Sequence, residues 1–184
     1  MGVAVPQRRI TLAYACTSED ASGLITDEAR ALIGRETEQY LGELLFRDCQ
    51  RYAIATGDLN PLYFDADYAR RSAYGGLIAP PNMLTALRAW GAGAREDELA
   101  PDGVVDLPEE KLPIRLKRRM AGGQELTFHA PARPGDQITR RGGIVSMEEH
   151  AGRSGAFVLM VREDRYYNER AELLVTCRET VLVR

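Results

Sequence analysis

A carboxylate, an amide and a phenol lie close together in the segment Gly57-Asp58-Leu59-Asn60-Pro61-Leu62-Tyr63. Gly57 favours the end of a helix and Asn60-Pro61 favours a tight turn, so the segment predicts a turn that presents Asp58 and Asn60. A carboxylate held in this way can act as a general base toward water. The alternative is structural, because aspartate and asparagine side chains after a helix also form turns with their own backbone.

A second segment, Leu77-Ile78-Ala79-Pro80-Pro81-Asn82, leads into a helix that is apolar on most of its surface. A proline suits the first turn of a helix, so Pro80 and Pro81 mark its beginning. Asn82 either caps this helix or binds a ligand. Large apolar residues then recur at helical spacing, namely Met83, Leu84, Leu87 and Trp90. Such a stripe is more typical of a protein core than of a binding site.

Helices are predicted in the first half of the chain and antiparallel strands in the second. Capping residues and helical periodicity predict helices over 27–33, 48–56, 66–72 and 83–90. Period-two patterns between turn residues predict strands over 40–46, 124–130, 137–147, 155–163 and 171–183, and the charged, proline-rich residues 94–113 predict a loop. This order predicts an α+β domain with its helices on one face of a sheet, and the open edges of such a sheet favour a dimer.

Composition and charge exclude several classes of function. The 184 residues suffice for one domain with a core, assigned to residues 26–184 after an N-terminal arm over 1–25. The formal net charge of −3 gives no reason to expect a nucleic-acid partner. No apolar run approaches the length of a membrane span. Cys16, Cys49 and Cys177 are far apart and odd in number, which predicts reduced thiols in a cytoplasmic protein without a metal site. We expect no cofactor.

Together the two segments resemble the MaoC-like hydratase and dehydratase family. The match is most specific at Ala55-Thr56-Gly57-Asp58-Leu59-Asn60-Pro61-Leu62 and at Tyr74-Gly75-Gly76-Leu77-Ile78-Ala79, and Arg133-Pro134-Gly135-Asp136 resembles the family's turn before its long strands. The resemblance covers roughly residues 26–184 and implies the hot-dog fold, a long central helix wrapped by an antiparallel sheet. Ala79-Pro80-Pro81 is typical of the branch that forms the N-terminal half of two-domain hydratases and one subunit of heteromeric dehydratases.

The resemblance implies addition of water to a 2-enoyl thioester of coenzyme A or of an acyl carrier protein. Family members place an aspartate and a histidine five residues apart, in the pattern Gly-Asp-x-Asn-Pro-x-His, and use a glycine N–H at the start of the central helix as an oxyanion donor. Asp58 and Asn60 match this pattern, so they are candidate catalytic residues, with Tyr63 at the histidine position. In the family the acyl chain runs beside the central helix, so the resemblance allows the apolar stripe to serve both as core and as substrate tunnel. The candidate substrate-binding residues are Pro80, Pro81, Asn82, Met83, Leu87 and Trp90.

Two positions depart from the family pattern. Tyr63 replaces the histidine, and a phenol with an ordinary pKa near ~10 is a poor base at neutral pH, so we expect a packing residue with a satisfied hydroxyl. Pro81 stands at the glycine position and has no N–H to offer, and the loss of one oxyanion donor typically costs about 10²–10³ in rate. His129 falls within a strand pattern and is expected to be structural.

These departures favour a helper subunit that binds the acyl chain beside a second MaoC-like subunit with an intact Asp/His pair. Three other functions remain open: a self-contained hydro-lyase that uses Asp58 with Tyr63, a hot-dog thioesterase, and a binding module without catalysis. A homodimer is the alternative to a heteromeric assembly.

Overall fold

A computed structural model describes residues 23–86, 94–99, 103, 113–116, 118–153 and 155–184. Most of the predicted arm over 1–25 and much of the predicted loop over 94–113 lie outside these residues. The second half of the predicted helix over 83–90 also lies outside them, and with it Leu87 and Trp90.

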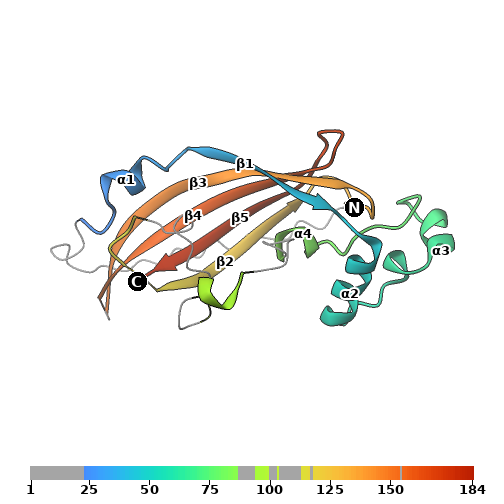
Figure 1. Cartoon of the computed structure of the whole chain (residues 1–184), viewed down its shortest axis with the longest axis horizontal. Helices are drawn as coiled ribbons and strands as arrows, with labels where there is room; N and C mark the ends of the chain where they lie inside the picture. The colour runs from blue at the N-terminus through green and yellow to red at the C-terminus, as the bar shows by residue number, and fades with distance from the viewer. Residues whose placement is uncertain (1–22, 87–93, 100–102, 104–112, 117, 154) are drawn as a thin grey trace, which may run out of the picture.

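Five antiparallel strands form one curved sheet in the order β1-β3-β4-β5-β2 (Figure 1). The strands are β1 (Glu36–Glu43), β2 (Arg119–Phe128), β3 (Gln137–Gly152), β4 (Gly155–Tyr167) and β5 (Leu173–Val183). The last four lie where the period-two patterns predict them, although β2 begins five residues early and β3 continues five residues further. The sheet and its few short helices confirm the predicted α+β class.

The first predicted strand and the helix after it both begin earlier than expected. β1 ends at Glu43 because its pairing with β3 ends there, opposite Gln137, the first residue of β3. The next helix, α2, spans Phe46–Thr56 and has Leu45 as its N-cap, without a side-chain cap. The expectation that Asp48 caps α2 is therefore wrong; Asp48 lies in the first turn, where a carboxylate still interacts favourably with the helix dipole.

Two other helices have the caps that the sequence predicts. The hydroxyl of Thr26 accepts a hydrogen bond from the N–H of Ala29 at the start of α1 (Asp27–Arg30). Asp65 accepts two hydrogen bonds at the start of α3 (Ala66–Arg71). α1 is shorter than the predicted helix over 27–33 because the chain leaves it to form a β-bridge between Ile33 and Ile144. The predicted central helix is represented by α4 (Met83–Ala86), its first turn.

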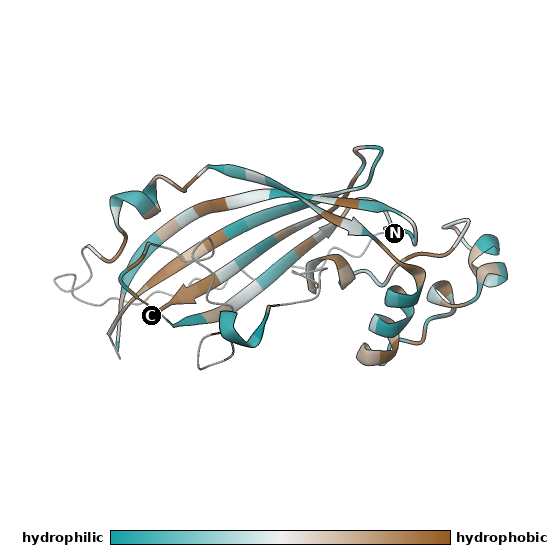
Figure 2. Cartoon of the chain, viewed as in Figure 1, coloured by the Kyte–Doolittle hydropathy of each residue, from teal (hydrophilic) through white to brown (hydrophobic). Residues whose placement is uncertain are grey.

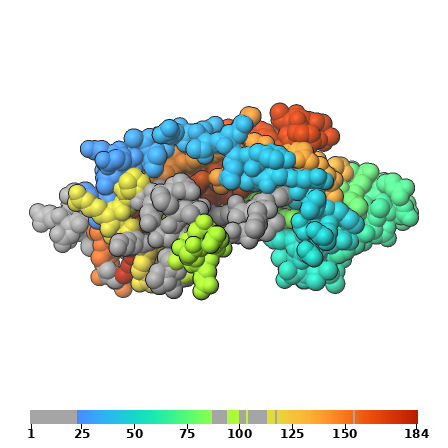
Figure 3. Space-filling view, in the orientation of Figure 1, coloured from blue at the N-terminus to red at the C-terminus, as the bar shows by residue number. Residues whose placement is uncertain are grey.

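Most of the helical segments lie at the two ends of the sheet (Figure 1). α2, α3 and the 3-10 helix η1 (Pro61–Tyr63) gather beyond one end, and α1 lies at the other (Figure 1). In the space-filling view, α2 and α3 form a lobe that projects from the body of the protein (Figure 3). A second 3-10 helix, η2, spans Glu96–Glu98. None of the helices in the described part of the chain has the length and hydrophobicity that crossing a bilayer requires.

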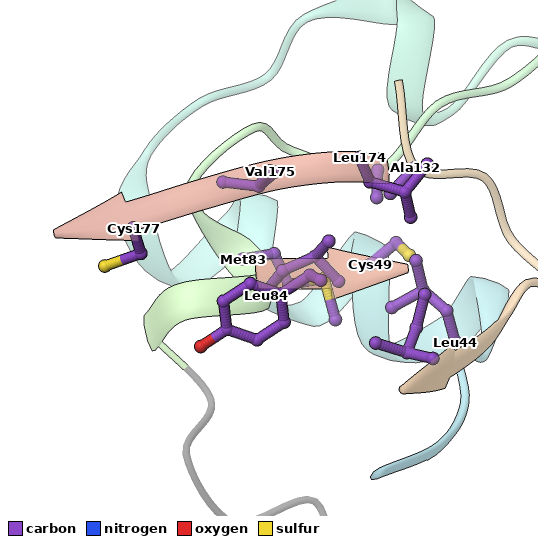
Figure 4. Close-up of a cluster of buried hydrophobic side chains, with 11 residues drawn as sticks. Leu44, Cys49, Met83, Leu84, Ala132, Leu174, Val175 and Cys177 are labelled. Carbon is purple, nitrogen blue, oxygen red and sulfur yellow. The ribbon is translucent and has the colours of Figure 1, made fainter. Parts of the chain in front are cut away.

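Two hydrophobic clusters pack against the sheet, where apolar and polar residues alternate along the strands (Figure 2). In the first cluster, Met83 and Leu84 of α4 lie between β5 on one side and the β1–α2 junction on the other (Figure 4). The second cluster packs α1 against β3 and β4 and contains Ile25, Ala29, Ile144, Met147, Val158, Met160 and Val183. The first cluster therefore positions α4 and the segment before it, which contains the candidate substrate-binding residues Pro80, Pro81 and Asn82.

Candidate functional site

The turn after α2 has the conformation that its sequence predicts. Gly57 ends α2 with φ of 72°, a left-handed conformation that glycine adopts without strain. The carboxylate of Asp58 accepts a hydrogen bond from the N–H of Asn60 at 3.3 Å. The side-chain oxygen of Asn60 accepts one from the N–H of Leu62 at 3.1 Å and caps η1. Both polar side chains therefore support the turn itself.

Tyr63 points back across this turn toward the carboxylate. Its hydroxyl donates a hydrogen bond to Oδ2 of Asp58 at 3.1 Å. The ring is only 4% exposed and packs with Ala53 and Ile78. Burial and the hydrogen bond to Asp58 raise the pKa of Tyr63 to about 12. The phenol therefore keeps its proton at neutral pH and acts as a donor, not as a base.

An apolar pocket of about 370 Å³ lies next to this turn. Its lining residues are Tyr74, Ile78, Ala79, Pro80, Pro81, Phe128, His129, Ala130, Pro131, Ala132 and Val175. Ile78 links the pocket to the turn, because it packs against Tyr63 and its N–H donates to the carbonyl of Leu62 at 3.2 Å. Pockets that bind apolar ligands commonly combine such walls with a few polar groups.

Of the four candidate residues at the start of α4, only the two prolines line the pocket. Pro80 is buried and Pro81 is exposed, and both line the pocket. The side-chain oxygen of Asn82 accepts a hydrogen bond from the hydroxyl of Thr85 at 2.5 Å, so this oxygen already has a partner within α4. Met83 is fully buried in the first hydrophobic cluster and is absent from the pocket lining.

The structure brings together one half of the predicted site and leaves the other half apart. Asp58, Asn60 and Tyr63 form one hydrogen-bonded turn, whereas Pro80 and Pro81 lie at the pocket. Neither Asp58 nor Asn60 is among the described residues that line the pocket. Leu87 and Trp90 lie outside the described residues.

Sequence reasoning missed the far wall of the pocket, which comes from the residues just after β2. His129 lines the pocket, and its Nε2 lies 3.0 Å from the hydroxyl oxygen of Thr176. The strand pattern places His129 near β2, but the approach of residues 74–81 to this strand end depends on three-dimensional packing. The turn Arg133-Pro134-Gly135-Asp136, which is visible in the sequence, lies directly after this wall.

The described residues contain no group of three or more histidine, cysteine, aspartate or glutamate side chains arranged to hold a metal ion. Burial raises the pKa of the Cys49 thiol to about 12, which leaves it protonated within the first hydrophobic cluster. Cys49 is therefore a packing residue and not a nucleophile.

The sequence matches a protein family described as FAS1-like, dehydratase domain region, over residues 31–177. A UPF0336 protein of Streptomyces avermitilis is 30% identical over 135 residues, which cover 73% of this chain and 80% of that protein. The 3-oxo-4,17-pregnadiene-20-carboxyl-CoA hydratase alpha subunit of Mycobacterium tuberculosis is 30% identical over 110 residues. This match covers 56% of the chain but only 34% of that longer protein.

Solved structures show which fold the chain has. The ChsH1-ChsH2 complex of Mycobacterium tuberculosis contains a chain that matches with a TM-score of 0.66 and 21% identity, over 84% of this chain and 93% of that one. A MaoC-like dehydratase from Rhodospirillum rubrum matches with a TM-score of 0.59 and 20% identity, over 82% and 91%. These matches confirm the hot-dog fold that the sequence motifs predict.

Proposed function

Because this chain belongs to the family of FAS1-like dehydratase domain regions and has the hot-dog fold of MaoC-like enzymes, we propose that it is one subunit of an enoyl-thioester hydratase or 3-hydroxyacyl-thioester dehydratase. In this proposal the chain binds the acyl group, and a second MaoC-like subunit with an intact Asp/His pair supplies the base. The reaction adds the oxygen of water to C3 of a 2-enoyl thioester and a proton to C2, with (R) stereochemistry.

The hydrogen bond from Tyr63 to Asp58 is the observation that supports the helper role most strongly. Hydration needs a group that accepts a proton from water. At the family's histidine position this chain has a buried phenol that is already a donor to the neighbouring carboxylate. A pKa of about 12 keeps that phenol protonated, so the pair lacks the imidazole's ability to take up a proton near neutral pH.

Pro81 provides a second, independent argument. Members of the family stabilise the thioester oxygen with a backbone N–H at the start of the central helix, and proline has none. Pro81 is exposed at the pocket, just before α4. An oxyanion donor at this position must then come from another group, which favours a partner subunit.

The names of similar proteins favour an assembly of two kinds of chain. The hydratase relative from Mycobacterium tuberculosis is named an alpha subunit, and ChsH1-ChsH2 is a complex of two differently named proteins. The apolar pocket beside Pro80 and Pro81 supports an apolar acyl group as the part of the substrate that this chain binds.

The test is the rate of crotonyl-CoA hydration, which is measured as the loss of enoyl absorbance. The rate is compared between the purified chain alone and the chain with a partner that carries the Gly-Asp-x-Asn-Pro-x-His pattern. We expect at most a trace rate from the chain alone and a large increase in the assembly. Robust hydration by the chain alone would refute the helper role. Release of free thiol, measured in the same samples, would instead favour a thioesterase.

One observation favours the alternative of a self-contained hydro-lyase. Asp58 is exposed, so solvent reaches its carboxylate even though one oxygen accepts a hydrogen bond from Asn60 and the other accepts one from Tyr63. Under this alternative the isolated chain hydrates crotonyl-CoA, and Asp58→Asn abolishes that rate. An isolated activity that survives Asp58→Asn would exclude it.

A further inference from the structure

The pocket beside α4 is formed by two segments that are far apart in the sequence. One wall comes from residues 74–81, and the other from residues 128–132 at the end of β2 and just after it, with Val175 of β5 beside them. One backbone hydrogen bond joins the walls directly, from the N–H of Ala79 to the carbonyl of Ala132 at 2.8 Å. A single backbone bond does not fix the position of the rest of the first wall, which begins five residues earlier at Tyr74.

Arg133 forms the second connection between the walls. Its Nη2 donates a hydrogen bond to the carbonyl of Tyr74 at 2.6 Å, and its Nη1 donates to the carbonyl of Leu77 at 3.4 Å. Both acceptors belong to the first wall, whereas Arg133 directly follows the second. A guanidinium carries several N–H donors in a rigid plane, so it can hold two carbonyls at a fixed separation.

The backbone of Arg133 is itself held in place. Its N–H donates to Oδ2 of Asp136 at 2.7 Å within the turn. Asp136 is 6% exposed, and its carbonyl accepts a hydrogen bond from the N–H of Leu44 at 2.9 Å. The turn therefore rests on the junction between β1 and α2, next to the first hydrophobic cluster. This anchorage gives the side chain of Arg133 a fixed origin from which to hold the first wall.

Gly76 shows how closely the guanidinium approaches the first wall. A Cβ atom added at Gly76 would lie 3.3 Å from Nη1 of Arg133, which is tighter than ordinary van der Waals contact. A side chain at this position would require the guanidinium to shift by a few tenths of an ångström, which would disturb its hydrogen bonds to the carbonyls of Tyr74 and Leu77. Gly76 thus offers a second way to disturb the same contact while Arg133 stays in place.

From these contacts, and resting on the proposed function, we propose that Arg133 is the positioning residue of an acyl-binding pocket. It sets the separation of the two walls between which the apolar acyl group of a thioester lies. The described hydrogen bonds of the Arg133 side chain both go to backbone carbonyls, so in this assignment it acts through the walls and makes no charge contact with the substrate.

Isothermal titration calorimetry tests this proposal. Octanoyl-CoA and free coenzyme A are titrated separately into the whole chain, in the assembly in which it purifies. We expect Arg133→Met to raise the Kd of octanoyl-CoA by about tenfold, with unchanged stoichiometry and an unchanged Kd for free coenzyme A. Arg133→Lys, with one nitrogen for two carbonyls, should give an intermediate Kd. Arg141→Met is the matched control, because Arg141 pairs with Glu38 and does not line the pocket.

The outcomes separate this inference from the function on which it rests. If the wild-type protein binds octanoyl-CoA no better than coenzyme A, the proposed function fails and the inference fails with it. If the wild type binds the acyl group and folded Arg133→Met has the same Kd, or loses only stoichiometry, the inference alone is overturned. Should Arg133→Met not fold, Arg133→Lys decides: a raised Kd for octanoyl-CoA supports the proposal, and an unchanged one overturns it.

Discussion

At the scale of single residues, the Asp58–Tyr63 pair combines two functions that are usually separate. The carboxylate supports the turn through the N–H of Asn60 and also accepts the hydroxyl of Tyr63. A buried hydroxyl without a partner would be costly, so the carboxylate also satisfies the phenol. The same carboxylate is thereby less available to a water molecule than an unoccupied one.

Replacing Tyr63 by phenylalanine tests this account of the phenol. We expect Tyr63→Phe to lower the free energy of unfolding by about 1 kcal/mol at pH 7, because the hydrogen bond to Asp58 is lost. The wild-type pKa of about 12 lies above the unfolded value near ~10, so the unfolded chain releases this proton first as the pH rises. The difference in the free energy of unfolding between wild type and variant should therefore disappear between about pH 10 and 12. Urea titrations of both proteins at each pH measure this difference. A difference that grows with pH would contradict this account.

The sequence predicts which single residues have a role at the site, but it does not predict how they are arranged in space. The tyrosine with a satisfied hydroxyl is expected from its chemistry, and the structure shows that its partner is Asp58. The separation of Asp58 from the pocket lining, and the presence of His129 in it, depend on how residues 74–81 meet the end of β2. No local pattern in the sequence encodes that meeting.

At the scale of elements, local signals predict helix ends well wherever no strand competes. Thr26, Gly57 and Asp65 cap or end their helices as expected. The errors occur where strand pairing determines the end of an element. The bridge between Ile33 and Ile144 shortens α1, and β1 ends opposite the first residue of β3. These two pairings join residues that lie about 90 to 110 positions apart, so the sequence near each element does not reveal them.

Glu149 of β3 holds the segment that contains α1. Its two carboxylate oxygens accept hydrogen bonds from the N–H of Ile25 at 2.8 Å and the N–H of Gly23 at 3.1 Å, and Arg30 lies 3.7 Å away. Glu149→Gln leaves one acceptor for two donors, so we expect a loss of about 1–2 kcal/mol in the free energy of unfolding, measured by urea titration. Limited proteolysis should also become faster between residues 23 and 33.

The neighbouring Glu148→Gln is the control for that change. The side chain of Glu148 is 64% exposed, and its carboxylate lies 3.5 Å from His150. Removal of this exposed charge should therefore change the free energy of unfolding little. Equal destabilisation by both substitutions would show that Glu149 does not act through the α1 segment.

At the scale of the whole molecule, β1 and β2 are the two edges of the sheet among the strands that the structure describes. Almost every residue of both strands is at least partly exposed, and β2 is exposed along nearly its whole length. Open edges of this kind favour pairing with another chain, which agrees with the proposal of a second hot-dog subunit. The order of the elements predicted from the sequence is enough to predict the α+β class. The same order does not indicate which chain pairs with the edges of the sheet.

In the proposed assembly this chain contributes binding, and another subunit contributes proton transfer. The most direct measurement is the rate of crotonyl-CoA hydration by the reconstituted assembly in which only this chain carries Asp58→Asn. The side-chain oxygen of asparagine can still accept a hydrogen bond from Asn60, so the turn should persist. We expect a rate within about a factor of two of the wild-type assembly, which corresponds to well under 1 kcal/mol in the activation barrier. A fall of about a hundredfold or more, in an assembly that remains intact, would show that Asp58 takes part in the chemistry and would contradict the claim.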